Sequence, residues 1–89
     1  MFESEEVHDA LASLLSDLSH RRLLVSLGEY ADEEALDFYS ELEEEAYFMA
    51  KVVDKLDVVA LLAEILSDDR IDVALKARFV LLAAAVLKS

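Results

Sequence analysis

The sequence contains no cysteine and no proline, and Gly28 is its single glycine. Without cysteine the chain has no disulfide, no thiolate metal ligand and no cysteine nucleophile. Without proline, and with one glycine, it lacks the turn residues that a hairpin-rich or loop-rich fold needs. We therefore predict one all-α domain, residues 1–89, folded as a compact up-down bundle of four to five helices around an apolar C-terminal helix.

Basic residues and long apolar runs are also scarce. Eight lysines and arginines stand against twenty acidic residues, and the formal net charge is −12. Nucleic acid and anionic lipid attract a positive field, so we expect no direct nucleic-acid binding and no membrane binding. The longest apolar run has nine residues, whereas a membrane span needs about 20. The N-terminal residues lack the basic and apolar regions of a signal peptide, so we expect a cytoplasmic protein.

The residues that commonly perform catalysis are not arranged for it. The eight serines occupy capping or helix-surface positions, and none lies in the glycine-flanked turn that exposes a nucleophile. One glycine cannot form a phosphate-binding loop. Carboxylates are abundant, but the sequence indicates no apolar pocket that would separate the pKa values of an acid and a base. We expect no enzymatic activity and no cofactor.

Two spacings are typical of carboxylate–histidine metal sites: Glu5-x-x-His8 and Asp17-x-x-His20. Residues three apart share a helical face, as in di-iron carboxylate bundles. His8 and His20, however, are about 18 Å apart along one continuous helix, so they cannot bind the same ion. A carboxylate–histidine metal-binding protein is the third functional hypothesis, but because of this separation we predict no metal site.

Helical periodicity is clearest in two segments. The first is an amphipathic segment, either one continuous helix or a helix that breaks near Ser19-His20, and Gly28 closes it in the left-handed conformation. Its apolar stripe consists of Val7, Leu11, Leu14 and Leu18. Asp32 then predicts the N-cap of a helix whose seam keeps its spacing through three heptads. That seam consists of Ala35, Tyr39, Leu42, Ala46, Met49, Val53 and Leu56. Residues 33–66 form either one bent helix or two helices. If there are two, Asp57 caps the second.

The face opposite this seam is strongly acidic. Residues 29–45 contain nine carboxylates and no basic residue. Further along the same face, the acids lead into two apolar side chains. We name this face the acidic ridge, and it consists of Glu34, Asp37, Glu41, Glu44, Glu45, Phe48 and Val52. It is either a solvated helix surface or a docking site for a basic protein, to which Phe48 and Val52 supply an apolar anchor.

The segment 71–87, IDVALKARFVLLAAAVL, predicts a helix that is apolar on two nearly opposite faces. One stripe consists of Val73, Ala77, Val80, Ala84 and Leu87, and the other of Leu75, Phe79, Leu82 and Val86. Both sides must be covered, so the helix lies at the centre of the bundle or pairs with a second copy. Ala77 and Ala84 of the first stripe suit close packing inside the bundle. We therefore expect the second stripe, which consists of Leu75, Phe79, Leu82 and Val86, to mediate self-association or subunit contact.

Two short stretches resemble parts of helical families. LGEY (27–30) followed by EALDFY (34–39) resembles the interhelix junction of a tetratricopeptide repeat, although the motif occurs once and the closing proline is absent. LDFY (36–39) with LKARFV (75–80) is similar to the helical domain of archaeal GINS replication factors. This second resemblance covers about ten positions, and the chain has no room for the β-domain of that family. We assign the chain to neither family.

These features predict a non-catalytic, acidic protein–protein interaction module. The module either self-associates as a homo-oligomer or acts as a small accessory subunit of a larger assembly, and its protein partner is expected to be basic. The alternative is an acidic inhibitor or immunity-type protein that covers a basic nucleic-acid-binding surface of its target. The acidity can equally serve solubility or adaptation to high salt.

Overall fold

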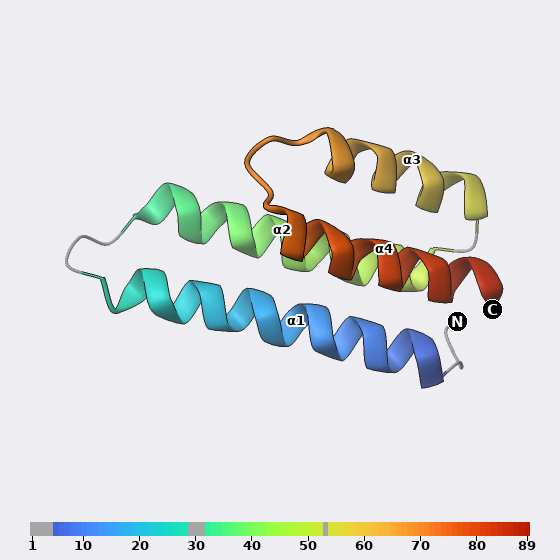
Figure 1. Cartoon of the computed structure of the whole chain (residues 1–89), viewed down its shortest axis with the longest axis horizontal. Helices are drawn as coiled ribbons and strands as arrows, with labels where there is room; N and C mark the ends of the chain where they lie inside the picture. The colour runs from blue at the N-terminus through green and yellow to red at the C-terminus, as the bar shows by residue number, and fades with distance from the viewer. Residues whose placement is uncertain (1–4, 29–31, 53) are drawn as a thin grey trace.

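The computed structural model describes residues 5–28, 32–52 and 54–89. They form four helices, α1 (Glu5–Ser26), α2 (Glu33–Lys51), α3 (Lys55–Ser67) and α4 (Val73–Lys88). Successive helices run in opposite directions, so the start of α1 and the end of α4 lie at the same end of the bundle (Figure 1). The predicted all-helical fold, with four compactly packed helices, is confirmed.

An aspartate caps the start of three helices. Asp32 begins α2, Asp54 begins α3 and Asp72 begins α4. Each carboxylate accepts a hydrogen bond of 2.9–3.1 Å from a backbone N–H two or three residues later, which would otherwise lack a partner. Residues 33–66 are therefore two helices, and the prediction that Asp57 caps the second is wrong by three residues.

The end of α1 differs from the prediction. The helix continues to Ser26, and the N–H groups of Leu27 and Gly28 donate to the carbonyls of Leu23 and Val25 at 3.0 and 3.2 Å. Gly28 does not have a positive φ, so its predicted left-handed conformation is wrong. These bonds satisfy the carbonyls of Leu23 and Val25 without a left-handed residue.

The core is built from one face of each helix. All four residues of the predicted α1 stripe are buried, as are the α2 seam residues from Leu42 to Met49. The seam does not continue beyond α2, because the chain leaves the helix at Val52. Val53 lies outside the described residues, and Leu56, at 76% exposed, is not a core residue. Ala35 and Tyr39, at the start of the seam, are half-buried, and the buried Ala50 was not predicted. The periodicity therefore predicted the core of α1 correctly, and that of α2 only from Leu42 to Met49.

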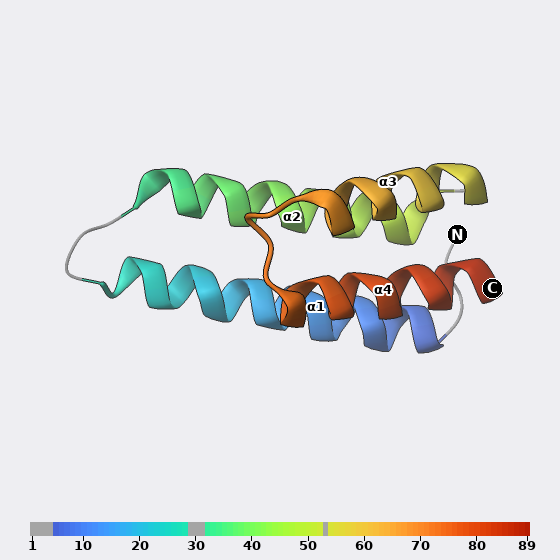
Figure 2. The ribbon, with the colours of Figure 1, turned by 45° about the horizontal axis from the view of Figure 1, so that its top comes forward.

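Helix α4 contacts α1, α2 and α3, and its Phe79 is the largest fully buried side chain. The hairpin of α1 and α2 extends beyond the shorter pair α3 and α4 (Figures 1 and 2). No other helix lies over the outward side of α4 in either view. The predicted covering of α4 on both sides is thus not confirmed. In the described part of the chain, no helix is both long and apolar enough to cross a membrane.

Candidate protein-interaction surfaces

Five residues of the acidic ridge lie on the solvent side of α2. Glu34, Asp37, Glu41 and Glu44 are exposed, and Phe48 is 54% exposed. Their 3-4-3-4 spacing makes one stripe roughly 21 Å long at 1.5 Å per residue. Among the described residues, none of these four carboxylates forms a salt bridge. The four charges therefore lie in water beside a large apolar side chain.

Two residues assigned to the ridge lie elsewhere. Val52 is half-buried and packs against the core, since the chain turns at the end of α2. Glu45 is half-buried and lines a cleft between α2 and α3. Burial raises the pKa of Glu45, and the negative charges of Glu64, Glu41 and Asp68 raise it further. Glu45 and Val52 were therefore wrongly placed on the outer face.

One arginine offsets part of the negative charge between α2 and α3. Arg70 donates to Asp68 through Nη2 at 2.7 Å and Nε at 3.0 Å. These side-chain bonds, with a bond from the Arg70 backbone N–H, lower the pKa of Asp68 to about 2. The guanidinium carbon of Arg70 also lies 4.2 Å from the ring centroid of Phe38, within cation–π range. Phe38 and Arg70 are far apart in the sequence, so no local pattern indicated this contact.

A second group of ion pairs joins α1 to α4. The Asp17 carboxylate accepts from Nε of Arg21 at 3.1 Å and pairs with Nε of Arg78 at 3.1 Å. Arg21 also donates to both carboxylate oxygens of Asp72, and Arg78 donates to the hydroxyl of Ser13. Arg21 and Arg78 are thus held by side chains of the bundle and do not form an open basic patch.

The stripe that we expected to contact a partner is part of the core. Leu75, Phe79, Leu82 and Val86 are between 0 and 7% exposed and pack against the other three helices. The expectation that these side chains form an interface is therefore wrong for the folded chain. Burying leucine and phenylalanine removes more apolar surface from water than burying alanine and valine, and this difference selects the larger stripe for the core.

The opposite stripe is open instead, except for Leu87, which is half-buried and packs against the core. Its exposed residues and the neighbouring Leu81 form a surface that we name the α4 outer face, which consists of Val73, Ala77, Val80, Leu81 and Ala84. All five residues are exposed, Val73 to 81% and Leu81 to 64%. A contiguous exposed apolar surface is typical of a contact site. The sequence revealed that α4 is apolar on two faces but not which face is covered.

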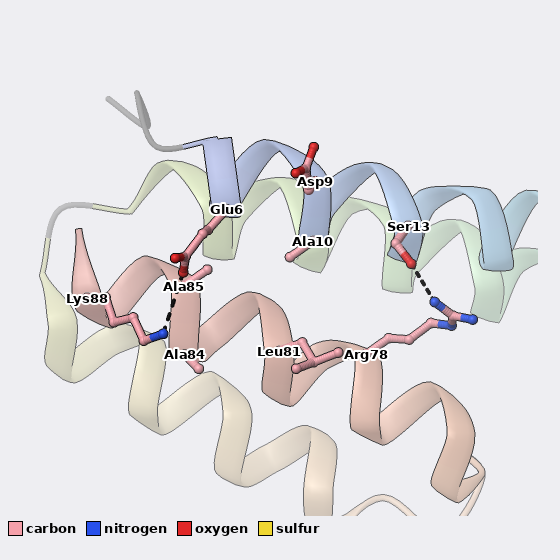
Figure 3. Close-up of a pocket in the computed structure, with 9 residues that line it drawn as sticks. All are labelled: Glu6, Asp9, Ala10, Ser13, Arg78, Leu81, Ala84, Ala85 and Lys88. Carbon is pink, nitrogen blue, oxygen red and sulfur yellow. Dashed lines mark hydrogen bonds and ion pairs between the residues drawn. The ribbon is translucent and has the colours of Figure 1, made fainter.

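A shallow groove of about 390 Å³ borders the α4 outer face, between α4 and α1 (Figure 3). Ala10, Leu81 and Ala84 contribute apolar surface, and Arg78 and Lys88 lie toward its two ends. Lys88 forms an ion pair of 3.5 Å with Glu6 across one end. The groove offers a place for an apolar side chain between charged ends. It contains no histidine, and its one hydroxyl group belongs to Ser13, which already accepts from Arg78.

A third apolar surface lies at the end of α1. Leu23, Leu24 and Leu27 are each more than half exposed. They belong to the last turns of α1 and the turn that follows, and this end of α1 lies where the α1–α2 hairpin extends beyond α3 and α4 (Figure 2). No sequence pattern singled out these leucines, because their exposure depends on how far α3 and α4 reach along the hairpin.

The histidines lie on α1 as expected, and both are exposed. Within residues 5–28, 32–52 and 54–89, no group of three or more His, Cys, Asp or Glu side chains could hold a metal ion. No protein-family model matches the chain, and neither a curated protein nor a solved structure is similar enough to match it. The two short resemblances therefore do not extend to a family, and we argue function from the residues alone.

Proposed function

We propose that the chain is a non-catalytic protein-interaction module whose acidic ridge docks a basic surface of a protein partner, as a small accessory subunit of a larger assembly. The observation that carries this proposal is the exposed part of the ridge. Within the part of the chain that the structure describes, four carboxylates that form no salt bridge follow one helix face and end at the half-exposed Phe48. In this proposal α4 is the apolar helix around which the others pack, and it holds α2 with its acidic side in water.

The charges and the aromatic side chain have different roles in such an interface. The row of carboxylates attracts a basic surface from a distance and thereby raises the association rate. Exposed charges contribute little to retention, because salt and water screen them. Phe48 has enough exposed apolar surface to enter a pocket on the partner, and buried aromatic side chains at the centre of an interface commonly dominate retention.

The first test is capture of the partner from a native lysate at low and high salt. The bait is the whole chain, either unchanged or carrying Glu41→Lys with Glu44→Lys. We expect the unchanged chain to retain a basic protein at low salt and the variant to lose it. A matched control carries Asp57→Lys with Asp69→Lys, which reverses two exposed charges away from the ridge and changes the net charge equally. Equal capture by both variants would contradict docking through the ridge.

The second test separates encounter from retention. With the captured partner in a surface-binding assay, reversing Glu41 and Glu44 should slow association and flatten its salt dependence. Phe48→Ala should accelerate dissociation and leave the association rate nearly unchanged. If neither variant alters the kinetics, the ridge is a solvated helix face.

The inhibitor or immunity-type function remains the alternative, and the same row of charges favours it. The carboxylates of the exposed ridge succeed one another every 4.5–6 Å along α2, and charges in a strand of nucleic acid likewise repeat every few ångströms. A protein that binds nucleic acid could accept this row in place of phosphates. Competition decides between the two functions, because nucleic acid should displace the chain from such a target and should not displace it from a structural partner.

A further inference from the structure

The apolar surface of α4 continues onto α3. Lys55, Val59, Leu62 and Leu66 share one stripe of α3, and Nζ of Lys55 donates to the carbonyl of Leu87 at 3.0 Å. This stripe therefore faces α4, and the exposed Val59 and Leu66 widen the α4 outer face toward α3. Together these side chains leave roughly several hundred Å² of apolar surface in water, the size that marks contact sites on soluble proteins.

The charges of α4 are arranged with opposite signs at its two ends. The helix contains Lys76, Arg78 and Lys88 but no acidic residue, and Asp72 caps its start. Asp72 and Lys88 both lie eight residues from Val80, which is roughly 12 Å along the helix in each direction. Val80 is thus the midpoint between a negative and a positive end.

We propose that two copies of the chain form a dimer through their α4 outer faces, with the two α4 helices antiparallel and Val80 near the twofold axis. Lys88 of each copy then lies beside Asp72 of the other, and the helix dipoles oppose each other favourably. Within one chain Asp72 accepts from Arg21 and Lys88 pairs with Glu6, but the Asp72 and Lys88 side chains are 54% and 72% exposed, so each has surface left for a second partner. A parallel pair would instead place Lys76, Arg78 and Lys88 beside their own copies, where like charges repel. Charge complementarity therefore favours a second copy in the antiparallel orientation.

The side chains along this face suit that pairing. Ala77 lies three residues before Val80 and Ala84 four residues after it, so the alanines of the two copies meet and let the backbones approach closely. Leu81 borders the groove between α1 and α4, and in the dimer it reaches the apolar surface of the second copy's groove. The dimer contact uses residues of α4 and leaves the acidic ridge, which lies on α2, outside it.

The first experiment measures the mass of the whole chain by sedimentation equilibrium between about 5 and 200 µM, and we expect a dimer. Leu81→Glu should weaken the dimer at least tenfold while the circular dichroism stays helical, because Leu81 is an exposed residue. Leu24→Glu is the matched control, since it makes the same substitution at a residue 56% exposed outside the face. It should leave the dimer intact.

The second experiment determines the orientation and uses the absence of native cysteine. In the antiparallel dimer the two copies of residue 80 meet, so Val80→Cys should form a disulfide-linked dimer under mild oxidation. The two copies of residue 73 lie roughly 21 Å apart along the axis, beyond the reach of a disulfide, so Val73→Cys should remain unlinked. A parallel dimer would link both variants.

Four results would overturn the proposal. The first three are an unchanged chain that is monomeric at 200 µM, a Leu81→Glu variant that stays dimeric, and efficient linking through residue 73. Species that grow beyond a dimer with concentration would indicate a head-to-tail contact and would also overturn it. The variant with Glu41→Lys and Glu44→Lys should still dimerise, so failure of ridge docking and failure of the dimer are separately observable.

Discussion

Adjacent leucines of α4 offer the sharpest test of which face is buried. Leu82 is 0% exposed and Leu81 is 64% exposed, although the two differ by one position in the same helix. Leu82→Ala removes three fully buried carbon atoms and leaves a cavity, which costs about 2–5 kcal/mol. Leu81→Ala removes atoms that are mostly in water and places the best helix former at that position, so its cost should stay within about 0.5 kcal/mol.

The difference is large relative to the stability of the chain. At about 0.05–0.15 kcal/mol per residue, 89 residues give an unfolding free energy of roughly 4–13 kcal/mol. A loss of about 3 kcal/mol from Leu82→Ala lowers the midpoint of thermal unfolding by roughly 12–24 °C in a domain of this size. Leu81→Ala should shift it by no more than a few degrees.

The measurement is urea and thermal unfolding by circular dichroism at low micromolar concentration, where a dimer contributes least. Ala83→Leu and Ala84→Leu form a second matched pair, because Ala83 is buried and Ala84 is exposed. Overpacking at Ala83 should cost about 1–3 kcal/mol, whereas leucine at Ala84 should be nearly neutral. If Leu81→Ala and Ala84→Leu were the destabilising members of their pairs, α4 would be rotated from the orientation described and its core assignment would fail.

Two further predictions concern carboxylates. The pKa of Glu45 is raised in the folded chain, so its ionisation opposes folding at neutral pH, and this cost disappears as pH falls through that pKa. Glu45→Gln should therefore raise the midpoint of thermal unfolding at pH 7 and reduce the change of that midpoint on mild acidification. The control Glu44→Gln, at an exposed residue, should do neither. The hydrogen bond from Arg21 lowers the pKa of Asp72, so its contribution is present above the unfolded pKa and is lost as pH falls through the folded one. In urea unfolding, Asp72→Ala should lower the free energy of unfolding by about 1–2 kcal/mol at pH 7 and by less at pH 2. Asp32→Ala removes an N-cap that has no such arginine partner among the described residues, so it is the control. If Asp72→Ala costs no more than Asp32→Ala, the bonds to Arg21 add nothing to the cap.

The sequence predicted the cores of α1 and α2 because their apolar residues follow a single stripe. Val7, Leu11, Leu14 and Leu18 recur at helical spacing with polar residues between them, so only one face can be buried. Helix boundaries were less accurate. Asp54, Asp57 and Asp72 are all good N-caps by chemistry, and tertiary packing decides which of them lies where the chain turns.

The orientation of α4 could not be predicted from periodicity, because both of its stripes are apolar. The size of the side chains and the length of each stripe distinguish the buried stripe from the open one. The buried stripe continues backward to Ile71, which is 4% exposed, whereas the open stripe continues forward to the exposed Lys88. Long-range pairs such as Arg21 with Asp72 and Arg70 with Phe38 have no sequence signature, since they depend on how the helices are packed.

The two proposed contacts should respond to salt with opposite signs. Docking of a basic partner on the acidic ridge depends on attraction between unlike charges, so raising sodium chloride from 50 to about 500 mM should weaken it by slowing association. The dimer instead joins two chains that each carry a net charge of −12, and its contact is mainly apolar. Salt screens the repulsion between the copies more than it weakens the pairs of Asp72 with Lys88, so the dimer should tighten over the same range. Sedimentation equilibrium at both salt concentrations measures this directly. A dimer that dissociates with salt would show that charge pairs, and not the α4 outer face, hold the two copies together.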